Sequence, residues 1–355
     1  MSTRIHPQDV MKVLSSVRDT AQQKDIVALG MVKDVEVGDQ RVTFTLQLQN
    51  PHNPANGQIV RSAREAVAAL GVADVQVRIA PAQAPARGPN SNLIPNVKST
   101  VAVGSGKGGV GKSTVAANLA IALHLQGAKV GLMDTDVYGP SVPTLMGAHQ
   151  EPVVVDGKIA PPVEYGIKLI SMGYFLPKDD AVIWRGPMLH KTIQQFLGDV
   201  RWGELDYLII DMPPGTGDIQ LSLCQTIPLT GAVIVSTPQD LALHVASKAI
   251  TMFQKLNVPV LGIVENMSYF ICPHCGQRED IFGHGGARAA AQKLGFSFLG
   301  EIPLETAIRV KSDSGKPVAL DAATPQGKAF GEVAAAVAVQ VKNARAKAEE
   351  EIMIE

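Results

Sequence analysis

The chain has 355 residues, which is enough for two domains and a large hydrophobic core. Its formal net charge of −1 and the lack of a basic block in its sequence speak against nucleic-acid binding. No apolar run reaches the length of a membrane span, the first residues have no signal region, and three cysteines do not suit a secreted disulfide framework. We therefore expect a soluble, cytoplasmic protein without nucleic-acid or membrane partners.

Residues 1–81 have the pattern of a small α+β domain. Helical and alternating apolar spacings predict a helix, two strands forming a hairpin, a second helix and a last strand, at residues 7–17, 31–37, 41–48, 59–70 and 75–79. The loop at residues 50–54 contains His52 but no cysteine, so we assign no metal chemistry to this domain.

Residues 82–97 are rich in proline, glycine and asparagine, which is typical of a linker. From residue 98 onward, apolar runs alternate with helical patterns, and strands are expected at residues 99–103, 129–133, 167–171, 207–210, 232–235, 258–264 and 296–299. This order predicts an α/β domain over residues 98–345, with a mostly parallel sheet covered by helices on both faces. A helix over residues 327–342 closes it, and residues 346–355 form an acidic tail.

A phosphate-binding loop follows the first of these strands. Gly106, Gly111, Lys112 and Ser113 fit the P-loop spacing G-x-x-x-x-G-K-[ST], between an apolar strand and a helical pattern. Glycines let backbone N–H groups converge on an anion, and the helix adds the positive end of its dipole. Lys112 is expected at the β- and γ-phosphates and the Ser113 hydroxyl on Mg²⁺. The whole nucleotide-binding set comprises Gly106, Lys107, Gly108, Gly109, Val110, Gly111, Lys112, Ser113 and Thr114.

Lys107 is a second lysine in this loop, directly after the first motif glycine. By its loop position alone it is a solvated surface charge. The string Lys-Gly-Gly-Val-Gly-Lys, however, resembles the deviant Walker A motif of the MinD/ArsA/nitrogenase-iron-protein group of ATPases. The resemblance implies an ATP-dependent homodimer in which Lys107 reaches the partner's nucleotide and acts in catalysis together with Lys112.

Three carboxylates also follow predicted strands, where ligands of parallel sheets bind. Asp211 comes after four apolar residues, as a Walker B aspartate does, and is expected to hold Mg²⁺ directly or through water. Asp134 and Asp136 are two residues apart and point the same way on an extended chain. One of them can serve the water shell of the metal while the other positions the attacking water. The resemblance implies that Asp136 activates water and that Asp134 is the outer-shell metal residue.

Asn266 follows the strand predicted at residues 258–264. It matches a position at which related ATPases hydrogen-bond adenine. A plain loop asparagine is the alternative interpretation, because asparagine is common in turns. Recognition of the base is therefore less well marked than binding of the phosphates.

Cys272 and Cys275 form a C-x-x-C pair, and Gly276 lets the turn close. A zinc ribbon needs a second such pair, and Cys224 is isolated in a predicted helix. A thioredoxin-like redox pair should open a helix after the first strand, whereas this pair lies late in the chain. Two further interpretations are half of an iron–sulfur site and half of a shared zinc site. In both, twofold symmetry between two chains brings the required four thiolates together.

Five strings together resemble the Mrp/ApbC family of P-loop ATPases that carry iron–sulfur clusters: residues 104–113, 134–141, 184–188, 211–218 and 272–275. The resemblance implies a [4Fe–4S] cluster held by Cys272 and Cys275 of two subunits, transfer to apo-proteins, and slow ATP hydrolysis. A zinc-handling ATPase is one alternative. A MinD-like spatial or membrane-associated regulator is another, but it should carry a basic amphipathic C-terminal helix, and this tail is acidic.

Overall fold

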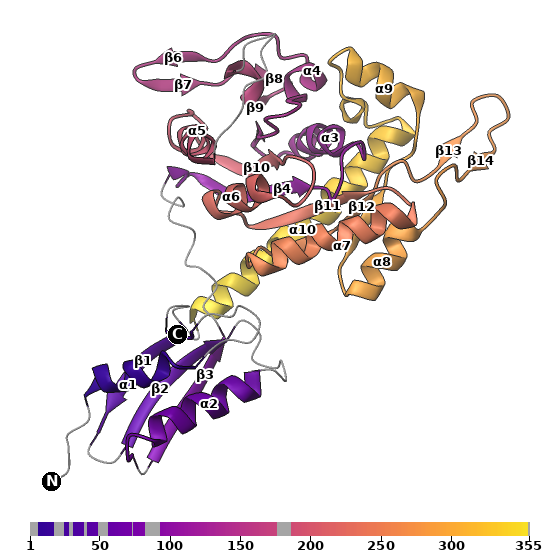
Figure 1. Cartoon of the computed structure of the whole chain (residues 1–355). Helices are drawn as coiled ribbons and strands as arrows, with labels where there is room; N and C mark the ends of the chain where they lie inside the picture. Colours follow the sequence, from indigo (N-terminus) through magenta and orange to yellow (C-terminus); the bar gives the residue numbers. More distant parts are fainter. Residues whose placement is uncertain are drawn as a thin grey trace. The chain divides into compact units, whose positions relative to one another are not determined.

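The computed structural model (Figure 1) describes residues 6–17, 25–27, 31–38, 41–48, 56–72, 74–81, 93–175 and 186–353. The chain divides into two compact units, Met1–Ala86 and Arg87–Glu355. Three features of the sequence lie partly or wholly outside the described residues: the loop at 50–54, most of the linker at 82–97, and the first two residues of the string at 184–188.

The first unit contains a three-stranded sheet in the order β1-β2-β3 with two helices. Its elements are α1 (Pro7–Leu14), β1 (Val32–Val37), β2 (Arg41–Leu48), α2 (Asn56–Ala68) and β3 (Asp74–Pro81). The predicted hairpin is confirmed, because β1 and β2 are antiparallel and the Gly38 N–H donates to the Arg41 carbonyl at 2.8 Å. Phe44 and Leu46 of β2 are fully buried against Leu14 and Val67 of the helices.

The second unit is built on an eight-stranded sheet in the order β15-β12-β11-β4-β10-β5-β9-β8. All neighbouring strands are parallel except β8 and β9. The strands are β4 (Val97–Gly104), β5 (Val130–Asp134), β8 (Val163–Glu164), β9 (Ile167–Ser171), β10 (Leu205–Asp211), β11 (Gly231–Ser236), β12 (Val260–Glu265) and β15 (Phe298–Glu301). The predicted α/β architecture is confirmed.

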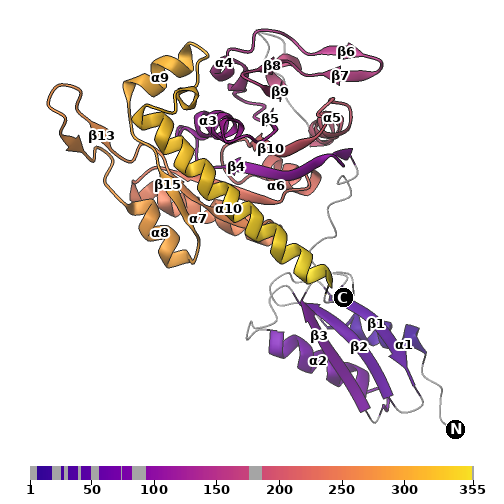
Figure 2. The same cartoon turned by 180° about the vertical axis from the view of Figure 1, so that it is seen from behind.

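Helices cover both faces of this sheet (Figures 1 and 2). One face is packed by α3 (Lys112–Leu125), α4 (Val142–Met146), α9 (Thr306–Asp313) and α10 (Pro325–Met353), and the other by α5 (Gly186–Gly198), α6 (Asp218–Thr226), α7 (Asp240–Lys255) and α8 (Gly286–Leu294). Val101 and Val103 of β4 face the α3 side and Ala102 the opposite side, as the two-residue period of a strand requires. Because α3 packs against both the sheet and α10, every residue from Val115 to Leu123 is buried.

The helix expected at residues 327–342 is longer than predicted. α10 continues to Met353 and therefore includes most of the acidic tail. Two hairpins were not predicted: β6 (Val153–Val155) with β7 (Lys158–Ala160), and β13 (Phe270–Ile271) with β14 (Arg278–Glu279). Strands of two or three residues are too short for an alternating pattern to be recognised in the sequence.

Candidate functional site

Three chain segments meet at the carboxyl end of the central strands. β10 lies between β4 and β5, so that Asp211 is in register with Val103 on one side and Asp134 on the other. β4 leads directly into the P-loop and α3. The sheet topology therefore places the P-loop and both carboxylate-bearing segments in one place, as the strand pattern predicts.

The backbone of the P-loop requires glycine at two positions. Gly109 and Gly111 have φ angles of +77° and +80°, in the left-handed region that disfavours residues with a Cβ. Gly111 is also the N-cap of α3, and no side chain caps this helix end. The first turn of α3 therefore presents N–H groups and the positive end of its dipole to an anion, which is the basis of phosphate binding.

Neighbouring segments brace the loop from both sides. The Ser105 hydroxyl donates to the Lys107 carbonyl at 2.9 Å, which closes the first part of the loop. The Gly215 N–H, in the loop after β10, donates to the Ser105 carbonyl at 3.1 Å. On the other side, the Asn266 carboxamide Nδ2 donates to the Val110 carbonyl at 2.8 Å. The conformation of the loop thus depends on the ends of β10 and β12 as well as on its glycines.

Lys112 forms a buried ion pair with the Walker B aspartate. Its Nζ lies 2.6 Å from Asp211 Oδ1 and donates to the Ser113 hydroxyl at 3.0 Å. The Lys112 side chain is 6% exposed and that of Asp211 is fully buried. A buried ammonium needs such a partner, since an unpaired charge in the interior is costly. This pair links the start of α3 to the end of β10.

The second oxygen of Asp211 suits a metal. Oδ2 is buried and, within the described part of the chain, has no hydrogen-bond partner. Burial raises the pKa of Asp211, and the Lys112 ammonium opposes that rise. A buried oxygen without a donor is stabilised when a cation reaches it. Together with the Ser113 hydroxyl next to Lys112, it provides the oxygen ligands that Mg²⁺ prefers, so these residues fit the expected magnesium ion.

Asp134 is held by protein donors on both oxygens. Oδ2 accepts from the Ser171 hydroxyl at 2.8 Å and from the Val142 N–H at 3.2 Å, and Oδ1 accepts from the Asp136 N–H at 3.0 Å. Burial, followed by the nearby charge of Asp211, raises the pKa of Asp134 to about 7. These contacts leave Asp134 suited to hydrogen-bonding a metal-bound water rather than to binding the metal itself.

Asp136 has different surroundings. β5 ends at Asp134, and the Asp136 N–H donates to the Asp134 carboxylate. Asp136 Oδ1 instead accepts from the N–H groups of Tyr138 and Gly139, both at 3.2 Å. Its Oδ2 lies 3.9 Å from Lys112 Nζ. Asp136 therefore faces the P-loop lysine, at the place where a terminal phosphate is expected.

Lys107 and Asn266 are placed differently from each other. Lys107 lies on the P-loop and is partly exposed. Its ammonium forms no ion pair with Asp134, Asp136 or Asp211, three residues that the structure describes, whereas that of Lys112 pairs with Asp211. Asn266 is 6% exposed, and its carboxamide nitrogen is engaged by the Val110 carbonyl. Its backbone N–H donates to Ser236 at the end of β11. Hydrogen bonding of Asn266 to adenine stays a prediction, with Oδ1 as the available atom.

Cys272 and Cys275 lie in the turn of the β13–β14 hairpin. The Cys272 N–H donates to the Gln277 carbonyl, and the Gly276 N–H donates to the Cys272 carbonyl, both at 2.9 Å. Gly276 has a φ angle of +70°, which closes the turn. The N–H groups of Cys275 and His274, and then the Cys275 thiol, lower the pKa of Cys272. The turn therefore stabilises a thiolate at Cys272 beside the exposed Cys275.

Cys224 has the opposite environment. It lies in α6, where it is buried among apolar side chains. Burial raises the pKa of its thiol to about 12. A thiol that is buried and protonated neither binds metal nor reacts readily, because the thiolate is the reactive form.

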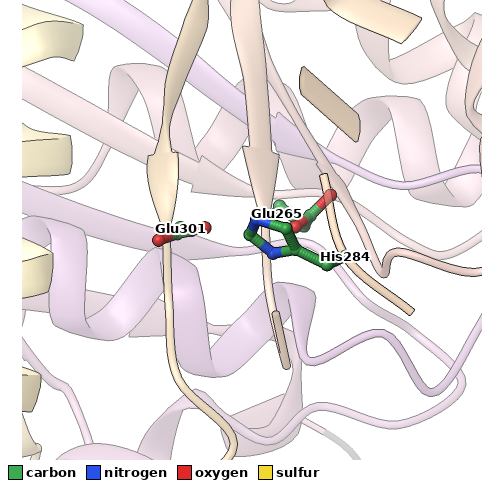
Figure 3. Close-up of side chains that lie close together, drawn as sticks. All are labelled: Glu265, His284 and Glu301. Carbon is green, nitrogen blue, oxygen red and sulfur yellow. The ribbon is translucent and has the colours of Figure 1, made fainter. Parts of the chain in front are cut away.

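The sequence did not reveal a group of charged side chains at the base of the hairpin (Figure 3). Glu265 at the end of β12, Glu301 at the end of β15, and His284 have ligand atoms within 4.8 Å of one another. Arg278 of β14 contacts both Glu301 and His284. These residues come from segments far apart in the chain, and only the neighbouring positions of β12 and β15 in the sheet bring them together.

The conformation of Gly111 leads to a prediction. A Cβ at this position would overlap the Asn266 carboxamide nitrogen, and its φ angle is +80°. We expect Gly111→Ala to lower the free energy of unfolding by about 2 kcal/mol and to weaken nucleotide binding, as denaturant titration and nucleotide titration would measure. Gly331→Ala is a matched control, because Gly331 lies in α10 with open space around its Cα. Equal stability of the two variants would contradict the expected strain.

Two families match the chain. Residues 96–338 match the family described as NUBPL iron-transfer P-loop NTPase, and residues 7–79 match the iron-sulfur cluster assembly protein family. A Deinococcus radiodurans protein named iron-sulfur cluster carrier protein is 49% identical over 314 residues, covering 88% of this chain and 88% of that protein. A Dictyostelium discoideum protein named iron-sulfur cluster transfer protein NUBPL is 47% identical over 253 residues, covering 70% and 78%.

Solved structures resemble the second unit. A nucleotide-binding protein from Archaeoglobus fulgidus, solved with ADP, is 43% identical with a TM-score of 0.59, and the match covers 67% of this chain and 93% of that one. The cell division ATPase MinD of Pyrococcus furiosus is 23% identical with a TM-score of 0.53, covering 68% and 98%, which is a likeness of fold alone. Among the described residues, no helix combines the length and apolar character needed to cross a membrane.

Proposed function

This chain belongs to the NUBPL iron-transfer family of P-loop NTPases, and from that membership we propose that it carries an iron–sulfur cluster on Cys272 and Cys275 and delivers it to apo-proteins. The observation that carries the proposal is the cysteine turn, which is closed by two backbone hydrogen bonds at 2.9 Å and holds two accessible free thiols at the tip of the β13–β14 hairpin. Thiolates are the ligands of iron–sulfur clusters. The names of the 49% and 47% identical relatives support the same activity.

We propose that the cluster is a [4Fe–4S] cluster shared by two subunits of a homodimer. Each chain supplies two thiols in this turn, and a [4Fe–4S] cluster takes four. A twofold axis that brings two such turns together provides the complete set. The turn is exposed, which suits a cargo that must be handed over.

On the nucleotide side, we propose that residues 106–114 bind ATP and that Ser113 and Asp211 hold Mg²⁺, with Asp134 in its outer shell. Bound there, Mg²⁺ would neutralise charge on the phosphate oxygens. When ATP binds, the Lys112 ammonium leaves Asp211 and contacts the β- and γ-phosphates instead. Lys107 of each subunit reaches the partner's nucleotide, and Asn266 hydrogen-bonds the adenine. Hydrolysis is slow and serves the release of the cargo.

We place this dimer in the cytoplasm, with apo iron–sulfur proteins as partners and without nucleic acid or membrane. The three cysteines are free thiols, which suits a reducing compartment. Flotation with lipid vesicles and ATP distinguishes the carrier from a membrane-associated regulator. The carrier should stay at the bottom of the gradient with unbound protein, whereas the regulator would rise with the vesicles.

Asp136→Ala should separate ATP binding from ATP hydrolysis. Asp136 is the carboxylate that faces Lys112, where a water attacking the terminal phosphate needs a hydrogen-bond acceptor. We expect hydrolysis to fall by about a hundredfold or more while the affinity for ATP is kept. Phosphate release and nucleotide titration measure the two quantities. Asp313→Ala removes an exposed carboxylate in α9 and should change neither. Unchanged turnover of Asp136→Ala would remove Asp136 from this role.

Anaerobic reconstitution of the full chain with iron and sulfide tests the proposed function. We expect visible charge-transfer absorption, four irons per two chains, a dimeric molar mass in solution, and activation of an added apo-ferredoxin. Zinc instead of iron in protein purified without oxygen would indicate a zinc-handling ATPase. A monomer that retains its iron and sulfide would contradict the shared cluster.

A further inference from the structure

Arg278 makes four contacts at the base of the cysteine hairpin. Its Nε lies 2.9 Å from Asp280 Oδ1, its Nη2 lies 2.6 Å from His284 Nδ1, and its Nη1 lies 3.9 Å from Glu301 Oε1. Its guanidinium carbon is 4.2 Å from the centre of the Tyr269 ring. A planar guanidinium has five N–H donors in a fixed fork and a flat face that stacks on an aromatic ring, whereas an ammonium has three donors on one atom. Arg278 therefore joins β14 to the end of β15 and to the loop before α8.

The partners of Arg278 are themselves fixed to the sheet. Glu265 is fully buried and accepts from the Ala287 N–H at 2.7 Å, so it caps the start of α8. The Ser268 hydroxyl lies 2.6 Å from Glu265 Oε1 and 3.1 Å from Glu301 Oε2. One hydroxyl thus lies between two carboxylates. Arg278, a residue of strand β14 in the hairpin, is the cation beside this acidic pair.

The group of Glu265, His284 and Glu301 is better described as an ion-pair anchor than as a metal site (Figure 3). Both oxygens of Glu265 already accept hydrogen bonds from the protein. The Arg278 guanidinium lies 2.6 Å from His284 Nδ1 and 3.9 Å from Glu301, so it contacts two of the three residues of this group. The hairpin itself therefore supplies a positive charge to Glu301, while hydrogen bonds from Ser268, Gly285 and Ala287 stabilise Glu265.

The orientation of the hairpin depends on this base. β13 and β14 are two residues each and pair with one another, and residues 273–280 are exposed. Figure 1 shows the hairpin projecting from the body of the second unit. The turn at Cys272 is closed by its own hydrogen bonds, so it sets how the two thiols lie relative to each other, whereas contacts at the base set where both point.

The same base is connected to the P-loop. Asn266, which donates to the Val110 carbonyl, directly follows Glu265. Ser268 follows two residues later, and its N–H donates to the Ile302 carbonyl. The segment from Glu265 to Tyr269 therefore contacts the P-loop near its start and Arg278 at its end. Only three residues, 267–269, lie between Asn266, which contacts the P-loop, and the start of the cysteine hairpin at Phe270.

We propose that Arg278 is a positioning residue for the cysteine pair: it holds the β13–β14 hairpin at a fixed orientation to the P-loop, so that two subunits present their thiols to one shared cluster. This inference rests on the proposed function, and it names the side chain that orients the cysteines. Without this anchor, each turn keeps its two thiols together, but the two turns meet less often in the geometry that one cluster requires.

Hydrogen exchange of the full-length apo protein tests the anchor without any cluster. In Arg278→Ala, we expect the amides of residues 270–279 to exchange about tenfold faster, with unchanged exchange in α3 and unchanged affinity for ATP. Arg278→Lys keeps the charge without the planar fork, so its hairpin amides should exchange faster than those of the wild type and more slowly than those of Arg278→Ala. Arg309→Ala is the control, because it removes an exposed arginine that pairs with Asp313 in α9. Unchanged exchange at the hairpin in Arg278→Ala overturns the proposal.

Loss of the reconstituted cluster to an iron chelator tests the positioning role. We expect the rate of loss to rise about tenfold in Arg278→Ala, less in Arg278→Lys, and not in Arg309→Ala. Faster hairpin exchange together with an unchanged rate of cluster loss overturns the positioning role. If the wild-type chain assembles no cluster, the proposed function fails, and hydrogen exchange still decides whether Arg278 anchors the hairpin.

Discussion

Cys272→Ser should abolish cluster binding in the reconstituted protein. Serine fills nearly the same space, but its hydroxyl is not a thiolate, so two chains then offer two thiolates where a [4Fe–4S] cluster takes four. We expect loss of the visible absorption and of bound iron and sulfide, with ATP binding unchanged because the P-loop lies outside the hairpin. Absorption spectra and iron analysis under anaerobic conditions measure the effect.

Cys224→Ser is the matched control for this variant. Cys224 is buried in α6, and burial raises the pKa of its thiol to about 12, so it should not contribute to the cluster. The variant should keep its iron and lose some stability, since a hydroxyl replaces a thiol among apolar side chains. In the native wild-type chain, iodoacetamide should alkylate Cys272 and Cys275 before Cys224. Normal iron content in Cys272→Ser, with loss of iron in Cys224→Ser, would reverse the assignment.

Asp211→Asn should have two large effects. The variant loses the carboxylate expected to hold Mg²⁺, so we expect ATP hydrolysis to fall by at least about a hundredfold. It also leaves the Lys112 ammonium buried, with Asp136 within ion-pair distance at 3.9 Å. Breaking a buried ion pair on one side costs about 3–5 kcal/mol of unfolding free energy. Phosphate release and denaturant titration measure these effects separately.

A second substitution tells the two effects apart. Lys112→Gln combined with Asp211→Asn removes both charges and leaves two amides that can hydrogen-bond. We expect this double variant to regain most of the unfolding free energy lost in Asp211→Asn, because the Lys112 ammonium is no longer buried without its Asp211 partner. Hydrolysis should stay lost. A double variant as unstable as Asp211→Asn would show that the ion pair does not account for the destabilisation.

The fold and the nucleotide loop could be predicted because their signals are local. A strand of alternating or continuous apolar residues, followed by Gly106–Ser113 and a helical pattern, specifies β4, the P-loop and α3 within one stretch of sequence. The parallel sheet then implied that Asp134 and Asp211 lie at neighbouring strand ends, and their register shows this. That the carboxylates of Asp134 and Asp136 point the same way stays a prediction, whereas the hydrogen bond from the Asp136 N–H to the Asp134 carboxylate was not indicated by their spacing.

The cysteine pair shows where local signals end. Its spacing and Gly276 indicated a turn, but the two-residue strands that carry it have no periodicity of their own. Neither the lowered pKa of Cys272 nor the raised pKa of Cys224 follows from spacing, since the first depends on backbone N–H groups of the folded turn and the second on burial. The role of Arg278 was also absent from the sequence patterns.

The amino-acid sequence by itself determined the fold class, the P-loop and the presence of two thiols in one turn, because these depend on residues within a few positions of one another. Only the tertiary structure decided that Lys112 pairs with Asp211, that Asn266 braces the P-loop, and that Arg278 meets Glu301. Those contacts join residues that are distant in the chain. Their distances and burial depend on how strands order themselves in the sheet, which no local pattern records.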